Sequence, residues 1–237
     1  MISQGIYEGL DFREYIKEPG LSKSAVTKLM FSQAHYDAYL KGKFEPTPDM
    51  NFGSDVDRAI FEPDLPLAEY NLKTKTGQAY HDALHGMLDA LDRCKTASQL
   101  LSGGVAQVSL FWEAENGVVM KGRPDYMRRD WSLFIDYKTT TRADWFKWRW
   151  IARDTGADTQ AAIAVDGIQA IEGEGLDFIF IVQEKKPPYA IAIYEAPPAM
   201  LESGRAKYRT AIPLYKEYWK NGICHGYPDE VQENLDW

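Results

Sequence analysis

Cysteine is scarce in this chain, because its 237 residues include only Cys94 and Cys224. Two thiols cannot build a disulfide framework or ligate a four-cysteine iron–sulfur cluster, and they are typical of a reducing cytoplasm. No apolar run approaches the roughly 18 residues of a membrane-spanning helix. The first residues lack the basic and apolar regions of a signal peptide. We therefore expect a cytoplasmic protein with no iron–sulfur cluster and no membrane partner.

Positive charge is also in deficit, with 27 Lys and Arg against 35 Asp and Glu and a net charge of −8. This balance argues against a protein that coats nucleic acid non-specifically. The charge is uneven, however: residues 121–153 contain nine Lys and Arg against four Asp, a net +5, which leaves −13 elsewhere. The pattern predicts a basic stripe that holds a polyanion inside an acidic exterior. An ordinary charged surface helix after a hairpin is the alternative.

Residues 118–138 have the pattern of a β-hairpin whose bend is formed by the polar residues 128–130. A bend centred near residues 129–131 places Asp125 opposite residues 135–136, so that two carboxylates meet across the ladder. Asp136 and Lys138 are two apart on one strand and share a face. Two carboxylates can hold Mg²⁺, or Mn²⁺ in its place, and the lysine can orient or deprotonate an attacking water. The hairpin therefore predicts metal-dependent phosphodiester cleavage, unless it is only a solvated strand face with an ion pair.

The hairpin also resembles the signature of a known superfamily. Pro124-Asp125 followed by Asp136-Tyr137-Lys138 is similar to the motif of the PD-(D/E)xK nucleases. Residues 136–140, with two threonines after the lysine, resemble the D-x-K-T-T sequence of phage and prophage exonucleases of the exodeoxyribonuclease VIII (RecE) type.

Three further blocks resemble the same family, in the same order. Residues 20–36 are similar to its I-S-K-S…L…P-A-H-Y pattern, and residues 52–63 to its G-x-A-x-H-x-x-x-L-E-P segment. Gln160 stands where the family has a Q-x-x-x-Y motif. Two positions depart from the pattern, since Asp57 replaces the family histidine and Ala164 the tyrosine. An aspartate oxygen suits a hard cation, so we expect the metal site to be kept, whereas a hydroxyl that would contact DNA is lost.

The resemblance implies an α/β fold with a PD-(D/E)xK restriction-endonuclease-like core, in which helices flank a mixed central β-sheet. It implies that Asp125, Asp136 and Asp57 hold the metal, that Lys138 activates water and that Gln160 positions it. The expected DNA contacts are Arg123, Arg142, Lys147, Arg149, Ser22 and Ser24.

The implied activity is a Mg²⁺-dependent double-stranded DNA exonuclease that digests 5′→3′ and leaves 3′ single-stranded tails for annealing-type recombination. The family also implies a closed homo-oligomeric ring, a single-strand annealing partner, and phage or prophage origin in a bacterial cytoplasm. Two alternatives stay open. One is a structure-selective or site-specific endonuclease on the same core, and the other is a catalytically degenerate relative that only binds DNA.

Several of these residues also have structural interpretations. Asp57 could pair with Arg58 or cap its helix, and Gln160 could lie on a wet helix face. The serines at 22 and 24 could serve only as helix caps. Glu113 either joins the site or lies at its rim.

Residues 145–150 interleave aromatic and basic side chains, as do surfaces on which unpaired bases stack. Trp145 and Trp148, at i and i+3, are expected to face the core instead. Lys147 and Arg149 are expected to face outward.

A single nuclease domain is expected over residues 1–237, because 45% of the residues are hydrophobic and the chain can enclose one large core. Its parts are a helical region (20–101), a catalytic region (105–221) and a loosely held acidic tail (226–237), after an irregular lead-in (1–20). Helices are expected over residues 22–41, 53–61, 78–101, 143–153, 158–172 and 198–220. Strands are expected over residues 107–113, 118–127, 131–138, 176–183 and 188–195.

Overall fold

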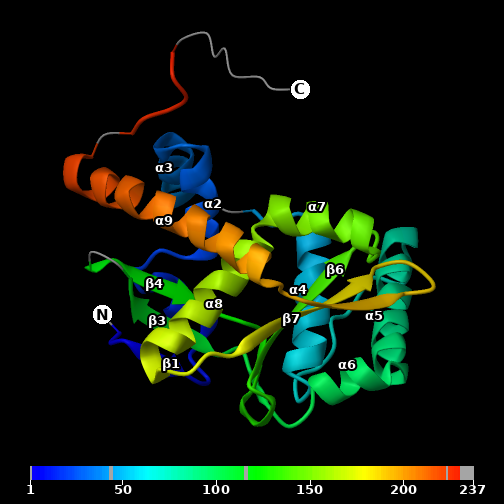
Figure 1. Ribbon diagram of the computed structural model, residues 1–237. Helices are drawn as coiled ribbons and strands as arrows, with labels where there is room; N and C mark the ends of the chain where they lie inside the picture. The colour runs from blue at the N-terminus through cyan, green and yellow to red at the C-terminus, as the bar shows by residue number, and fades with distance from the viewer. Residues whose placement is uncertain (1, 43–44, 115–116, 223, 230–237) are drawn as a thin grey trace.

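The computed structural model describes residues 2–42, 45–114, 117–222 and 224–229 as a mixed α/β fold (Figure 1). A five-stranded and a three-stranded sheet lie side by side, and helices cover both faces of the larger sheet. The expected α/β class, with a mixed sheet flanked by helices, is confirmed. Within the described residues, no helix is both long and apolar enough to cross a membrane.

The five-stranded sheet has the order β2-β5-β6-β7-β8. Only β6 and β7 are parallel, and the other neighbours are antiparallel. The parallel pair is connected through α7 (Trp145–Thr155) and α8 (Ala157–Glu172), since parallel strands need a crossover connection. The strands are β2 (Val105–Ala106), β5 (Tyr126–Arg128), β6 (Leu133–Thr140), β7 (Asp177–Glu184) and β8 (Ile191–Glu195).

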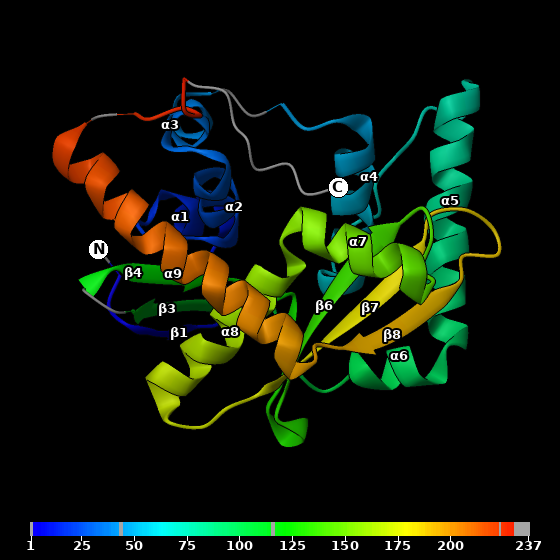
Figure 2. The same cartoon turned by 45° about the horizontal axis from the view of Figure 1, so that its top comes forward.

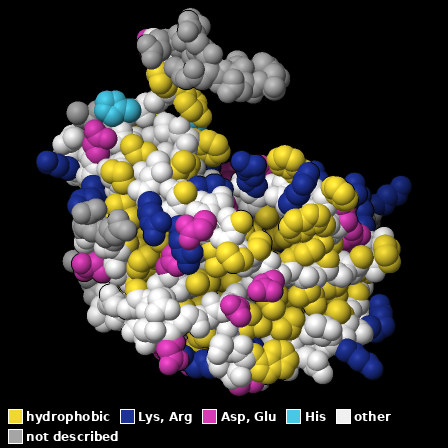
Figure 3. Space-filling view, viewed as in Figure 1, with side chains coloured by type: hydrophobic (Ala, Val, Ile, Leu, Met, Phe, Trp, Pro, Cys, Tyr) yellow, Lys and Arg dark blue, Asp and Glu magenta, His cyan; other side chains and the backbone are white. Residues whose placement is uncertain are grey.

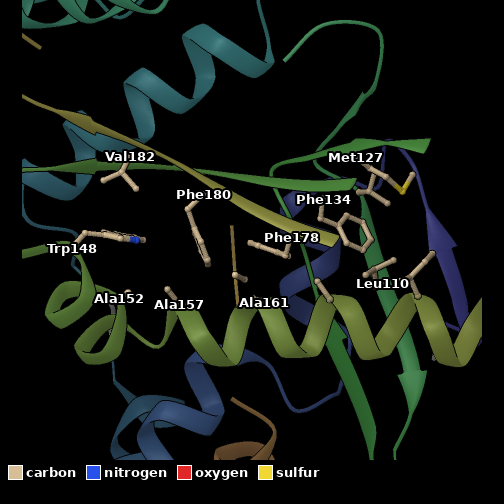
Figure 4. Packing of buried hydrophobic residues seen from close by; sticks show 14 of the residues in the cluster. Leu110, Met127, Phe134, Trp148, Ala152, Ala157, Ala161, Phe178, Phe180 and Val182 are labelled. Carbon is tan, nitrogen blue, oxygen red and sulfur yellow. The ribbon is translucent and has the colours of Figure 1, made fainter. Parts of the chain in front are cut away.

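Alternate residues of β6 and β7 serve two separate cores, because successive side chains of a strand point to opposite faces. Phe134 and Phe180 pack against α8, where small residues such as Ala161 let the helix approach the sheet closely (Figure 4). Ile135 and Ile181 pack on the other face, against three helices (Figure 2). Those helices are α4 (Pro48–Phe61), α5 (Lys75–Arg93) and α6 (Lys95–Leu100).

The smaller sheet has the antiparallel order β1-β3-β4. Leu29 of α2, Met120 of β4, Ile163 of α8 and Ile212 of α9 share one buried cluster. Because α8 also packs against β6 and β7, it connects the two sheets. The remaining elements are β1 (Gly5–Tyr7), α1 (Phe12–Lys17), α2 (Lys23–Phe31), α3 (Gln33–Lys41), β3 (Ser109–Glu113), β4 (Val119–Gly122) and α9 (Pro198–Asn221).

The expectation of one continuous strand over residues 118–127 is wrong. The chain leaves the smaller sheet after Gly122 and enters the larger sheet at Tyr126, so β4 and β5 belong to different sheets. Pro124 lies in the connection and has no N–H to donate to a ladder. The break brings Asp125 to the junction between the sheets.

Other expected boundaries differ for local reasons. The expected helix over residues 22–41 is interrupted at Ser32, whose side chain accepts a hydrogen bond from His35 N and begins α3. The expected helix over 78–101 is divided at Cys94. The expected helix over residues 53–61 begins earlier, at Pro48, because a proline at the first helical position loses no hydrogen bond.

The N-terminal end of the chain is more regular than expected. The lead-in expected to be irregular, residues 1–20, contains β1 and α1. Of the tail expected to be loosely held, residues 226–229 form no helix or strand, and residues 230–237 lie outside the described residues.

Close packing of α8 against α9 depends on Gly204. A Cβ at this position would lie 2.2 Å from the backbone oxygen of Asp158, and backbone cannot yield as a flexible side chain can. We expect Gly204→Ala to lower the free energy of unfolding by about 1–3 kcal/mol, the usual cost of overpacking. Urea unfolding measures the change, with Gly226→Ala as the control, since no atom lies within 4 Å of a Cβ there. Equal stability of the two variants would contradict the argument.

Candidate active site

The predicted acidic residues meet where the two sheets separate. β5 pairs with β6 only as far as the Tyr126–Ile135 pair, and continuing this register by one residue places Asp125 opposite Asp136. Beyond that point no strand among the described residues pairs with β6 on the β5 side. The Asp125 side chain takes this place, because its Oδ2 accepts a hydrogen bond of 2.8 Å from the backbone N–H of Tyr137.

The side chain of Asp136 contacts two other predicted site residues, Gln160 and Lys138. Its side chain is completely buried, and its Oδ1 accepts a hydrogen bond of 2.5 Å from Nε2 of Gln160 on α8. Its Oδ2 lies 2.5 Å from Nζ of Lys138, two residues along the same strand. The structure therefore brings together Asp136, Lys138 and Gln160.

Asp57 reaches the same electrostatic environment from α4. Burial raises its pKa to about 7, and the charge of Asp136 adds to the rise while Lys138 opposes it. Burial also raises the pKa of Asp125 well above its usual range, and the charge of Asp136 and then that of Asp57 add to the rise. Lys138 and the backbone N–H of Tyr137 oppose it. Asp57 and Asp125 are therefore both harder to ionise than ordinary aspartates, because they are buried beside another carboxylate.

Lys138 responds in the opposite direction. Burial by itself lowers the pKa of its ammonium, but the neighbouring Asp136, Asp125 and Asp57 outweigh burial and raise the pKa above the ordinary value. Lys138 is therefore a charged donor at neutral pH.

Lys23 is a site residue that sequence reasoning missed. Burial lowers its pKa, and nearby Lys138 lowers it further, whereas Asp136 and Asp125 act against this shift. The only signal in the sequence was its place between the two serines of the family-like segment 20–36. A second ammonium group thus faces the carboxylates from the first residue of α2.

An open cleft of about 600 Å³ leads to these groups. The residues around it come mainly from α1, α2, α4, α8 and the β4–β5 connection, and α3 and β4 also contribute. The predicted site residues that line it are Ser22, Ser24, Asp57, Arg123, Asp125 and Gln160. Lys23 and Arg58 line it as well, and they add two cations that could meet an anionic ligand.

The residues expected to contact DNA have diverse surroundings. Ser22 caps α2 by accepting a hydrogen bond from Ala25 N, while Ser24 is exposed. Arg123 donates to the Leu10 carbonyl oxygen, to Ser109 Oγ and to Gln107 Oε1, which fixes it within the protein at the cleft wall.

The other three expected DNA contacts lie outside the cleft lining. Arg142 forms an exposed ion pair with Asp144. Lys147 and Arg149 are exposed on α7, as expected. Trp148 is buried as expected, but the expectation that Trp145 faces the core is wrong, because 51% of it is exposed.

The donor atoms of this cluster fit a hard divalent cation. Oδ2 of Asp136 is buried and accepts no hydrogen bond of good geometry, although Lys138 Nζ is close. Carboxylate oxygens are the ligands that Mg²⁺ prefers. In the part of the chain that the structure describes, no three His, Cys, Asp or Glu side chains already lie together as a set that could hold a metal. The expectation that Asp57 completes the ligands with Asp125 and Asp136 therefore stays a prediction.

The raised pKa of Asp57 predicts a pH-dependent stability. The folded protein binds this proton more tightly than the unfolded chain, so the free energy of unfolding is highest below about pH 4 and falls as the pH rises to about 7. We expect Asp57→Asn, in EDTA, to be more stable than the wild type by about 2–4 kcal/mol at pH 8 and equally stable near pH 4. Urea unfolding at both pH values tests this, with the exposed Asp64→Asn as control. A gain that does not change with pH would contradict the electrostatic explanation.

Comparison with solved structures shows a likeness in fold over almost the whole chain. The chain superposes on a protein from Eubacterium rectale described as a "putative exonuclease" with a TM-score of 0.71 and 18% identity, covering 96% of this chain and 94% of that one. The structure of SSO0001 matches with a TM-score of 0.36 and 17% identity over 85% of this chain and 92% of that one. A search of curated proteins found no match.

A family model matches residues 22–231, which include every predicted site residue. The matching family is described as a PDDEXK-like domain of unknown function, DUF3799. Asp125, Asp136 and Lys138, the residues that resemble the motif for which this family is described, lie within the matched range. The chain therefore belongs to the DUF3799 family of PDDEXK-like domains, within the PD-(D/E)xK nuclease superfamily.

Proposed function

We propose that this protein is a Mg²⁺-dependent exonuclease of double-stranded DNA, with Mn²⁺ able to replace Mg²⁺. The observation that supports this most directly is the cluster of Asp125, Asp136, Lys138 and Gln160 at the uncovered edge of β6, beside an open cleft. Membership of the superfamily supports nuclease chemistry. The exonuclease mode is favoured by the sequence resemblance and by the description of the Eubacterium rectale protein.

In the proposed mechanism, Asp125 and Asp136, with Asp57, would hold the metal, which when bound would polarise the phosphate and acidify water. The oxygen of a water molecule would attack phosphorus while its proton passes to the solvent, and the bond to the leaving oxygen would break as that oxygen takes up a proton from the solvent. In the metal-free site Lys138 is a charged ammonium, and in this form it would orient the attacking water and stabilise negative charge on the phosphate. Gln160 holds the carboxylate of Asp136 in position through its hydrogen bond.

The cleft suggests how a DNA end is held. Ser22 and Ser24 stand at the N-terminus of α2, where free N–H groups and the helix dipole favour a terminal phosphate. Digestion from 5′ ends, 3′ single-stranded tails, a homo-oligomeric ring and an annealing partner in a bacterial cytoplasm are further parts of the proposal. They rest on the resemblance to the phage and prophage exonucleases.

The decisive experiment uses linear duplex DNA labelled at either its 5′ or its 3′ ends, beside covalently closed circular DNA. Mg²⁺-dependent loss of label from the 5′ ends, with circles intact and EDTA blocking the reaction, is the expected result. Cleavage of closed circles would show an endonuclease instead. DNA binding without hydrolysis in Mg²⁺ or Mn²⁺ would show a catalytically degenerate relative.

Gln160 is expected to act as a positioning residue. Gln160→Ala removes the hydrogen bond to Asp136 without removing a charge, and loss of such a supporting contact at a metal site typically costs about 10–100-fold. We expect kcat to fall by this factor and the Mg²⁺ concentration for half-maximal rate to rise. Gln169→Ala, on the same helix but distant from Asp136, is the matched control. A fall in kcat with an unchanged Mg²⁺ requirement would contradict a role in holding the metal ligand.

A further inference from the structure

The basic stripe of residues 121–153 divides into two groups once its contacts are known. Six of its nine cations have partners inside the protein. Lys121, for example, donates to the carbonyl oxygens of Tyr15 and Glu18, and Arg129 pairs with Glu172. The others of this group are Arg123, Arg128, Lys138 and Arg142. These six contribute to folding or to the catalytic cluster.

The other three cations, Lys147, Arg149 and Arg153, all lie on α7. Their side chains are exposed, and none of them has an ion-pair partner among the described residues. The helix itself contains one acid, Asp154. Within the basic stripe, the charge that is free to meet a polyanion is therefore concentrated on one helix, in a protein whose net charge is −8.

The same helix exposes three large aromatic rings. Trp145, Phe146 and Trp150 are 51%, 72% and 51% exposed. The guanidinium of Arg149 lies 5.7 Å from the ring centroid of Phe146 and 5.1 Å from that of Trp150. Positions 146, 149, 150 and 153 are three or four apart and form one strip on a helix. Over the region of α7, Figure 3 shows Lys and Arg side chains beside hydrophobic ones.

This strip lies close to the candidate active site along the chain. α7 ends at Thr155 with Gly156 as its C-cap, and the first turn of α8 brings Gln160 onto Asp136. Gly156 also packs closely on α2, where a Cβ would lie 2.9 Å from Thr27 Oγ1 and 3.8 Å from a carbon of Lys23. At 1.5 Å per residue, Trp150 is about 9 Å and Phe146 about 15 Å along the helix from Gly156. A strand that leaves the site could reach both rings.

We propose that α7 binds unpaired DNA by stacking bases on Phe146 and Trp150 while Lys147, Arg149 and Arg153 contact the phosphates. Rings interleaved with cations suit this ligand, because every base has a face to stack and every nucleotide a negative charge. Paired bases in a duplex do not offer their faces, so the strip selects single strands. The further proposal that the bound strand is the one left by digestion rests on the proposed nuclease function. The binding of unpaired DNA to α7 does not depend on that function.

The test measures binding in EDTA, where no hydrolysis interferes, by fluorescence anisotropy. The probes are labelled oligothymidylate of about 16 nucleotides and an abasic strand with the same number of phosphates. The double variant Phe146→Ala/Trp150→Ala is compared with Phe31→Ala/Trp219→Ala, which removes an equally exposed ring pair elsewhere. We expect the α7 variant to bind oligothymidylate at least about tenfold more weakly and the abasic strand almost unchanged, while the control resembles the wild type.

Equal binding of both probes by the wild type would overturn the proposal, because charge alone would then explain it. An α7 variant that binds oligothymidylate as tightly as the wild type would overturn it too. The nuclease proposal is judged separately by the end-labelled duplex. Cleavage without base-dependent binding would support the nuclease proposal and overturn base stacking on α7. Base-dependent binding without cleavage would support base stacking on α7 and overturn the nuclease proposal.

Discussion

Asp136→Asn is expected to reduce DNA cleavage by at least about 1,000-fold, equivalent to about 4 kcal/mol of transition-state stabilisation. Asparagine has the same shape and can still accept the hydrogen bond from Gln160, so the fold should persist. It lacks the negative charge with which Asp136 would hold a divalent cation. The measurement is the initial rate of Mg²⁺-dependent degradation of linear duplex DNA, together with circular dichroism to verify folding.

Asp177→Asn is the matched control for this change. Asp177 begins β7, the strand next to β6, and its side chain is exposed at the far end of the sheet from the cluster. Its replacement should leave the rate unchanged. A folded Asp136→Asn protein that degrades DNA at the rate of this control would exclude the cluster as the active site.

The opposition of Asp125 and Asp136 could be predicted from sequence because hairpin geometry is local. The polar bend fixes the register, and the structure places a short 3-10 turn at Arg129–Trp131, with Ser132 in the left-handed region at φ 51°. From there, side-chain alternation determines which residues face which core. Asp136 and Lys138 therefore share the face that meets α8, as their spacing indicated.

The break in the arm that contains Asp125 could not be predicted in the same way. Residues 118–127 have the composition of one strand, and only tertiary pairing shows that β4 belongs with β1 and β3. Arg123 contributes to the change of direction by donating to the carbonyl oxygen of Leu10, in a segment expected to be irregular. Partners separated by more than a hundred residues leave no periodic trace in a single sequence.

The approach of α2 to the site is another long-range result. Lys23 precedes Lys138 by more than a hundred residues, and its serine neighbours are explained by capping alone. Gln160 was placed at the site by resemblance to a family motif, whereas the contact with Asp136 depends on α8 lying between the two sheets. Sequence patterns thus locate the acids, and packing determines which cations meet them.

The ion pair with Asp136 explains why Lys138 should matter for stability as well as for catalysis. Lys138→Met is expected to slow cleavage by about 100-fold or more, because a charged donor near the phosphate is lost. It also leaves the fully buried Asp136 without its ion-pair partner. Removing one member of a buried pair costs about 3–5 kcal/mol, and we expect about 2–3 kcal/mol here since 27% of the Lys138 side chain is exposed.

The double variant Asp136→Asn/Lys138→Met separates these two effects. It removes both charges, so no unpaired carboxylate remains, and urea unfolding should show most of the lost stability restored relative to Lys138→Met. Cleavage should stay as low as in Asp136→Asn alone, because the metal ligand is absent. If stability is not restored, the ion pair is not what couples the two residues. If cleavage returns with stability, the loss in Lys138→Met reflected unfolding, and Lys138 would not be part of the catalytic cluster.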